Sequence, residues 1–275
     1  MIDFISKNIR HWLLHQPVPA FARNFDRMNR LFWKYPVQVS IAPAHGTLVA
    51  QDRTMQIHFA HPERVMRYAR QGIRPFLERL AAAYMVDAVP LARDDWVIDC
   101  GANVGELSMA LLGREPGLKV VAVEPEAREA DCTDANIYQG QPRTLRKVLW
   151  HEETTLRFFS APATADSSVF EPPVPHVVRE VMATTLDALV SSISAPRIRI
   201  LKLEAEGAEP EILRGAESAL AKIDYITADL GPERGMSQEQ TATPVINFLL
   251  ARGFDLVDMK FDRVVCLFKN RQVQQ

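Results

Sequence analysis

The sequence has few cysteines and no long hydrophobic run. The three cysteines, Cys100, Cys132 and Cys266, are odd in number and far apart, which argues against a disulfide framework and favours a reducing, cytoplasmic compartment. The longest apolar runs, such as Ala81 to Val86, fall far short of the roughly 18 residues that a membrane-spanning helix needs. Residues 1–15 mix charged and apolar side chains and lack the continuous apolar core of a secretory signal.

Repetitive and disordered architectures are also excluded. The 12 glycines and 18 prolines are scattered, no heptad pattern persists, and 47% of the residues are hydrophobic against 24% charged. This is the composition of an ordinary globular protein. The 275 residues suffice for one α/β domain of roughly 200 to 250 residues together with an extension.

Charge is distributed unevenly along the chain. Residues 1–75 carry a balance of +7, whereas the remainder carries −9. A basic segment attracts anionic partners such as a phospholipid surface, a nucleotide-activated sugar or a nucleic acid, although it can also be a solvated charged face. Apolar residues recur at helical spacing from Ile2 to Leu14, which predicts a short amphipathic helix that lies on a membrane, packs on the protein itself or contacts a second copy of the chain.

The pattern of apolar segments divides the chain into two parts. Residues 1–90 predict helices and short strands, and residues 91–275 alternate short apolar strands with helices, which is typical of an α/β, Rossmann-like, mostly parallel sheet. A connection of only a few residues forces the last two strands to pair as an antiparallel hairpin. The seven expected strands of this sheet are Trp96–Ile98, Lys119–Val123, Thr144–Leu149, Ile198–Leu203, Tyr225–Ala228, Phe254–Met259 and Val264–Phe268.

A turn of small residues follows the first of these strands. Asp99 ends the strand, and Gly101, Asn103 and Gly105 follow before a helix begins. Glycine lets a ligand lie against the backbone, and asparagine is among the few other residues that tolerate positive φ. The G-x-x-x-G spacing differs from the G-x-G-x-x-G loop that places a pyrophosphate at a helix N-terminus. The loop therefore predicts a ligand without phosphates.

Carboxylates follow two further strands. Glu124 comes directly after the second strand, where a carboxylate can accept hydrogen bonds from ribose hydroxyls. Lys202, Glu204 and Glu206 lie at the end of a central strand, the edge at which open α/β sheets hold their ligands. We interpret the nearby acidic residues of Glu209–Glu211 as helix-dipole complements in a first helical turn. Together these positions predict a nucleoside-binding site.

Several motifs resemble those of the FkbM-type S-adenosylmethionine-dependent methyltransferases, over about Asp94 to Phe268. The family usually has Asp where this chain has Glu204. The segments that carry the resemblance are Val97–Gly105, Val123–Pro125, Ala165–Ser168, Thr185–Asp187 and Leu201–Ala216.

The resemblance implies that S-adenosylmethionine is the cofactor and that a hydroxyl of a sugar, glycoconjugate or secondary metabolite is methylated. It implies that Lys202, Glu204 and Glu206 face the transferring methyl group. Residues implied to bind the cofactor are Asp99, Gly101, Asn103 and Gly105 at its methionine end, Glu124 at the ribose, and Asp166 and Ser167 near the adenine.

Methyl transfer to a hydroxyl needs a proton acceptor. We expect Glu204 or Glu206 to be the general base, with Lys202 orienting a carboxylate or the acceptor and Asp229 as a further option. The sequence offers no supporting His or Asp cluster for a metal ion, so none is predicted.

Two alternatives stay open at this point: an oxidoreductase or epimerase that uses NAD, and a non-catalytic module that docks on a membrane or a partner protein. Nucleic acid is not expected as a substrate, because the chain lacks an Asn-Pro-Pro-Tyr-like sequence and its net charge is −2.

Overall fold

The computed structural model describes residues 11–42 and 46–272. By internal contacts the chain divides into two compact units, residues 1–78 and 79–275. The sequence analysis placed the boundary between the two parts near residue 90, where the family-like motifs begin. That these two parts differ in function stays a prediction. The helix expected over Ile2–Leu14 lies largely outside the described residues, and residues 11–14 are helical.

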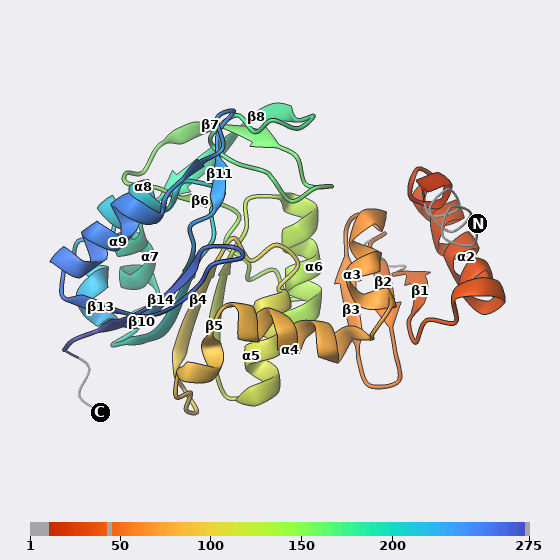
Figure 1. Ribbon diagram of the computed structural model, residues 1–275, viewed down its shortest axis with the longest axis horizontal. Coiled ribbons are helices and arrows are strands. Elements are labelled where there is room, and N and C mark those ends of the chain that lie inside the picture. Colours follow the sequence, from red (N-terminus) through yellow and green to blue (C-terminus); the bar gives the residue numbers. More distant parts are fainter. Residues whose placement is uncertain (1–10, 43–45, 273–275) are drawn as a thin grey trace. The chain divides into compact units, whose positions relative to one another are not determined.

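A mixed six-stranded sheet forms the centre of the unit 79–275 (Figure 1). The strand order is β13-β14-β10-β9-β4-β5, and β10, β9, β4 and β5 are parallel while β14 runs antiparallel to both of its neighbours. The α/β class and the antiparallel C-terminal hairpin are therefore confirmed. The strands are β4 (Trp96–Cys100), β5 (Lys119–Val123), β9 (Ile198–Leu203), β10 (Ile223–Asp229), β13 (Phe254–Lys260) and β14 (Val265–Asn270).

Strand direction brings distant segments to one edge of this sheet. Because β4, β5, β9 and β10 are parallel, the loops that follow them meet at the same edge. Asp99 of β4 is in register with Lys202 of β9, and Asp229 at the end of β10 is in register with Val265 at the start of β14. The turn before β14 therefore reaches the same edge, which we call the ligand edge.

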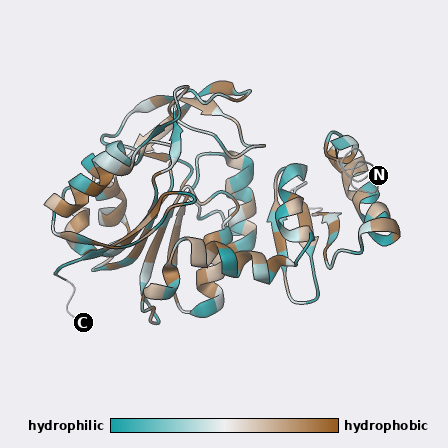
Figure 2. Ribbon diagram, in the orientation of Figure 1, coloured by the Kyte–Doolittle hydropathy of each residue, from teal (hydrophilic) through white to brown (hydrophobic). Residues whose placement is uncertain are grey.

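Helices cover both faces of the main sheet (Figure 1). One hydrophobic core joins the strands to α7, α8 and α9, and the strands show brown, hydrophobic stretches in Figure 2. The Thr185 side chain caps α7 by accepting a hydrogen bond from the Ala188 backbone N–H at 3.0 Å. The helical segments are η3 (Val86–Ala88), α5 (Glu106–Arg114), α6 (Ala127–Ile137), α7 (Leu186–Ser192), α8 (Glu209–Arg214), η4 (Ala219–Lys222) and α9 (Ala242–Ala251).

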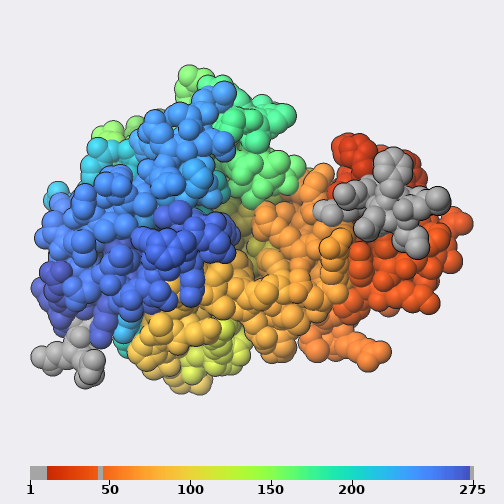
Figure 3. All heavy atoms as spheres, in the orientation of Figure 1, coloured from red at the N-terminus to blue at the C-terminus, as the bar shows by residue number. Residues whose placement is uncertain are grey.

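The seventh strand expected in the main sheet belongs mainly to a smaller sheet. Leu145 forms one parallel bridge to Val123 at the end of β5, and the chain then pairs with β8 instead. In the space-filling view, the green segments of β7 and β8 lie against the blue C-terminal part of the chain (Figure 3). The smaller sheets contain β6 (Val148–Leu149), β7 (Thr155–Ser160) and β8 (Val177–Thr184), and β11 (Pro232–Arg234) with β12 (Glu239–Gln240).

The unit 1–78 has its own small core. Its three short strands pair as an antiparallel meander, and aromatic side chains such as Phe21, Phe25 and Phe59 are fully buried. The elements are α2 (Val18–Met28), the π-helical turn η1 (Asn29–Trp33), β1 (Gln38–Ile41), β2 (Leu48–Gln51), β3 (Gln56–Phe59), η2 (Pro62–Arg64) and α3 (Val65–Ala69), and α4 (Ile73–Ala83) contains the boundary between the units.

All three cysteines are free and buried. Burial raises the pKa of Cys100 to about 12 and that of Cys266 to about 11. The thiols are thus protonated at neutral pH and act as small apolar side chains. Within residues 11–42 and 46–272, no helix is both long and apolar enough to span a bilayer.

Candidate functional site

The turn after β4 adopts a backbone conformation that few residues tolerate. Gly101, Asn103 and Gly105 have φ values of 72°, 51° and 83°, so the expectation that Asn103 takes the place of a glycine is confirmed. A Cβ atom on Gly101 would lie 1.9 Å from the backbone oxygen of Glu204. Only glycine therefore allows the loops after β4 and β9 to touch through their backbones.

Asp99 is a buried acceptor directly before this turn. Its side chain is 1% exposed, and Oδ2 accepts a hydrogen bond from Ser108 Oγ at 2.6 Å. Oδ1 lies 3.4 Å from Lys202 Nζ, at ion-pair distance, but has no hydrogen-bond partner within the described part of the chain. An unsatisfied buried oxygen is costly, so Oδ1 is available to a donor on a ligand.

Glu124 connects the end of β5 to the turn after β4. Its two carboxylate oxygens accept hydrogen bonds at 2.8 Å from the backbone N–H groups of Asn103 and Glu126. Burial raises the pKa of Glu124 to about 8 against the effect of the Glu126 N–H, and the nearby Glu129 carboxylate adds to the rise. The side chain that sequence reasoning assigned to the ribose is thus within the ligand edge and oriented by backbone donors.

The loop 161–168 is anchored to the same edge at two points. Ser167 Oγ donates to Glu126 Oε1 at 2.7 Å, and Ser168 Oγ donates to the Glu206 backbone oxygen at 2.9 Å. Asp166 is half-buried beside them, and its charge contributes to the electrostatics of Glu206. The loop therefore connects the segment after β5 to the segment after β9.

Lys202 is the central cation of the site. It is 3% exposed, and its Nζ donates to the Gly101 backbone oxygen at 2.6 Å and pairs with Glu204 Oε2 at 2.8 Å. Burial opposes its charge, but Glu204 and Asp99 together hold the pKa of Lys202 above its usual value. Its ammonium also lies 5.7 Å from the centre of the Tyr84 ring. Lys202 thus ties the β4 and β9 loops together.

Arg263, which sequence reasoning missed, binds two of the predicted carboxylates. It lies in the turn between β13 and β14, and its Nη2 donates to Glu204 Oε1 at 3.0 Å and to Asp229 Oδ2 at 2.5 Å. Burial opposes ionisation of Glu204, but Lys202 and Arg263 lower its pKa to about 2. Both oxygens of Glu204 are therefore engaged by cations, and this carboxylate is a weak base.

Glu206 and Glu233 differ from Glu204 because no cation pairs with either of them within the described residues. Both are half-buried. Burial raises the pKa of Glu206 well above its usual value, and the charges of Glu233 and Glu204 add to the rise. Burial also raises the pKa of Glu233 to about 8, with Asp229 and Glu204 contributing. Glu233 lies on β11, an element that the sequence analysis did not anticipate.

Glu209 and Glu211 do more than complement a helix dipole. Both lie in the first turn of α8, as expected, but Glu209 Oε1 accepts from the backbone N–H groups of Ala205 and Gly207 at 2.8 and 3.2 Å. Glu211 forms a two-point pair with Arg234 at 2.8 and 3.0 Å. These contacts fix the loop that carries Glu206.

The described residues contain no cluster of three or more His, Cys, Asp or Glu side chains that could hold a metal ion. The absence of a metal requirement stays a prediction.

The ligand edge has the features of a nucleoside-binding α/β enzyme: a turn of small residues at positive φ, a buried acceptor before the turn and a carboxylate after the next strand. The chain belongs to a family of such enzymes, since residues 99–256 match the methyltransferase FkbM domain. It is therefore a member of the S-adenosylmethionine-dependent FkbM methyltransferase family, as the sequence motifs indicated.

Similar proteins include one curated relative and several solved structures. The AMB antimetabolite synthetase AmbE of Pseudomonas aeruginosa is 22% identical over 63% of this chain, which spans 10% of the relative's length. Methyltransferase FkbM from Methylobacillus flagellatus is 16% identical, with a TM-score of 0.47 over 71% of this chain and 50% of its own. The N-terminal domain of human METTL16, in complex with SAH, is 13% identical, with a TM-score of 0.41 over 93% of this chain and 83% of its own.

Proposed function

We propose that the protein transfers a methyl group from S-adenosylmethionine to a hydroxyl of a sugar, glycoconjugate or secondary metabolite. The observation that carries this proposal is the Glu206 carboxyl, which has no cation partner within the described residues and lies next to Glu204, whose charge two cations neutralise. A hydroxyl becomes a good nucleophile only when its proton is removed. A carboxylate with a raised pKa is suited to that proton transfer.

In this proposal the cofactor lies along the turn after β4. Asp99, Gly101, Asn103 and Gly105 hold its methionine end, and Oδ1 of Asp99 supplies an acceptor that lacks a hydrogen bond within the described chain. The backbone of this turn is free of bulky side chains and reaches the start of α5. When bound, the cofactor supplies an electrophilic methyl group on a sulfonium.

The remaining cofactor contacts in the proposal come from the end of β5 and the loop 161–168. Glu124, held by two backbone N–H groups, accepts hydrogen bonds from the ribose hydroxyls. Asp166 and Ser167 line the adenine end, and the Ser167–Glu126 hydrogen bond keeps that loop against the ligand edge.

The catalytic roles follow from the charges. Glu206 takes the acceptor proton, and the nearby Glu233 carboxyl raises the proton affinity of Glu206, because two like charges at this place repel each other. Lys202 keeps the β4 and β9 loops in place, so that the acceptor oxygen is aligned for an in-line displacement. Asp229 and Glu204 act with Arg263 as a fixed charge network rather than as bases.

Two measurements test the proposal. Calorimetric titration with S-adenosylmethionine, S-adenosylhomocysteine and NAD in parallel should show binding of the first two and none of NAD. Release of S-adenosylhomocysteine in the presence of methyl glycosides and glycolipids then identifies an acceptor class. Binding of NAD, or methyl transfer confined to nitrogen acceptors, would overturn the proposal.

The base is identified by a matched pair of variants. Glu206→Gln should lower turnover by about 10²-fold or more and leave the S-adenosylhomocysteine affinity unchanged. Glu204→Gln should weaken the affinity as well, since it disturbs Lys202 and Arg263. If Glu206→Gln retains turnover, Glu206 is not the base.

We also propose a cytoplasmic location, in keeping with three buried, unpaired thiols. A homo-oligomeric assembly is a separate proposal, which analytical ultracentrifugation would test. The name of the Pseudomonas aeruginosa relative supports a secondary metabolite as one acceptor class.

A further inference from the structure

Four cations gather on and directly after the helical segment α2–η1. Arg23, Arg27 and Arg30 follow each other at spacings of four and three residues, which keeps them on the same side of a helix, and Lys34, which follows η1 in a left-handed conformation, lines one hollow together with Arg30. All four are exposed, and none forms an ion pair within the described residues. Asp26 is the single acidic residue between positions 11 and 51 of the sequence. We call these four side chains the basic row.

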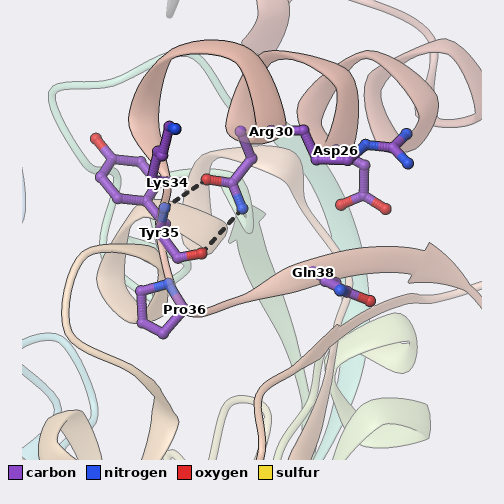
Figure 4. A pocket seen from close by; sticks show the side chains of 7 residues that line it. Asp26, Arg30, Lys34, Tyr35, Pro36 and Gln38 are labelled. Carbon is purple, nitrogen blue, oxygen red and sulfur yellow. Dashed lines mark hydrogen bonds between the residues drawn. The ribbon is translucent and has the colours of Figure 1, made fainter.

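Two hollows lie along the basic row and share Asp26 and Arg30. The smaller, of about 260 Å³, is also lined by Lys34 and Gln38 (Figure 4). The larger, of about 720 Å³, is also lined by Arg23. Each hollow therefore presents at least two cationic side chains to whatever enters it.

The walls of the smaller hollow are fixed by hydrogen bonds. The Asn29 side chain donates to the backbone oxygens of Tyr35 and Val37 at 3.1 and 2.8 Å, and it accepts from the Tyr35 N–H at 2.6 Å (Figure 4 draws the two bonds to Tyr35). Asp26 Oδ1 accepts from the Val39 backbone N–H at 2.8 Å. The one acid of this face is thus tied to β1. Arg30 is the one cation of the basic row whose charge acts on the pKa of Asp26, so Arg23, Arg27 and Lys34 are available to an external anion.

Large apolar side chains are exposed in the same segment. Leu31 and Phe32, both in η1, are 57% and 63% exposed. Leu31 follows Arg27 by four residues and so neighbours the basic row. Cations together with exposed Leu and Phe on a helical segment are typical of surfaces that lie in the headgroup region of a bilayer.

We propose that this face of the unit 1–78 docks on an anionic phospholipid membrane. Lipid phosphates occupy the hollows along the basic row, and Leu31 and Phe32 enter the boundary between headgroups and acyl chains. The charge excess of the segment complements an anionic leaflet, and the exposed apolar side chains gain an environment that a soluble anion or a nucleic acid would not offer. This inference is independent of the proposed methyl transfer.

Co-sedimentation of the full chain with vesicles tests the proposal. Vesicles of phosphatidylcholine with about one third phosphatidylglycerol should bind the protein at least tenfold more tightly than phosphatidylcholine alone, and raising the salt from about 0.1 to about 0.5 M should weaken that binding because the charges are screened. The charge variant Arg23→Glu/Arg27→Glu should lose at least tenfold in affinity. The apolar variant Leu31→Ser/Phe32→Ser should lose binding that persists at high salt.

Matched controls come from exposed positions elsewhere in the chain. Arg53→Glu changes an exposed cation of the same unit outside the basic row, and Val257→Ser changes a side chain that is 50% exposed on β13. Both should bind vesicles as the unmodified protein does, and thermal unfolding should show that all variants stay folded. The proposal is overturned if neutral and anionic vesicles bind equally, if Arg53→Glu loses as much affinity as the charge variant, or if the chain binds RNA or heparin but no vesicle.

Discussion

Replacing Gly101 by alanine tests whether the backbone contact between the β4 and β9 loops holds the site together. The added Cβ would lie 1.9 Å from the Glu204 backbone oxygen, which is 1.1 Å inside the 3.0 Å that real Cβ atoms respect. Because the obstructing atom belongs to the backbone, the loop after β9 must move. That movement lengthens the 2.6 Å hydrogen bond from Lys202 Nζ to the Gly101 oxygen.

The expected cost has two parts. The φ of 72° at Gly101 costs an alanine roughly 1–2 kcal/mol, and the forced displacement adds roughly 1–3 kcal/mol, as overpacking does elsewhere. Gly140→Ala is the matched control, since Gly140 has a φ of 80° but no atom within 4 Å of its added Cβ. Gly140→Ala should therefore lower the free energy of unfolding only by the cost of the positive φ, roughly 1–2 kcal/mol. Urea unfolding measures both changes in the free energy of unfolding.

Cofactor binding provides the second readout. Gly101→Ala should weaken S-adenosylhomocysteine binding at least tenfold in a calorimetric titration, because Lys202 and Glu204 shift with the loop, whereas Gly140→Ala should leave the affinity unchanged. If the two variants lose the same stability and bind equally well, the close approach of the two loops is not what shapes the site.

Three further predictions concern the charges of the ligand edge. The pKa values of Glu124 and Glu233 are both raised to about 8, so between pH 4.5 and 8 the folded protein binds more protons than the unfolded chain. The free energy of unfolding should therefore fall as the pH rises towards 8. Glu124→Gln should flatten that slope in a series of urea titrations. Arg263→Ala should lower turnover by about tenfold or more, because it leaves two carboxylates without their shared cation, whereas Arg271→Ala, which removes an exposed pair, should change turnover little. Glu209→Ala should cost about 1–3 kcal/mol in thermal unfolding, because two backbone N–H groups lose their acceptor, and an unchanged melting temperature would show that this carboxylate does not fix the loop.

The elements of the main sheet could be predicted because their signals are local. β5 and β9 have the bounds that their apolar runs indicated, and the short connection before β14 forced an antiparallel pair. The positive φ of Asn103 followed from its place between two glycines. The seventh strand was the exception. Val148–Leu149 pairs with β8 rather than with β5, and β8 lies far away in the sequence, so no local signal marks this pairing.

Parts of the site could not be predicted because they depend on tertiary contacts. Arg263 is an exposed residue in a turn, and only the register of Asp229 with Val265 brings it to Glu204. Glu233 had no motif to mark it. The sequence offered Glu204 and Glu206 as alternative bases. Only the positions of the surrounding cations show that the pKa of Glu204 is lowered while that of Glu206 is raised.

The three buried thiols have a practical consequence for following the motions of this enzyme. Cys100 directly precedes Gly101, at 3% exposure, so an alkylating reagent can reach it only when the β4 turn opens. The rate of its labelling by such a reagent therefore reports the opening of that turn, in the unmodified protein and without an introduced probe. Labelling of Cys266 in β14 reports wider unfolding and serves as the internal reference. A ligand that closes the β4 turn would slow the labelling of Cys100 more than the labelling of Cys266.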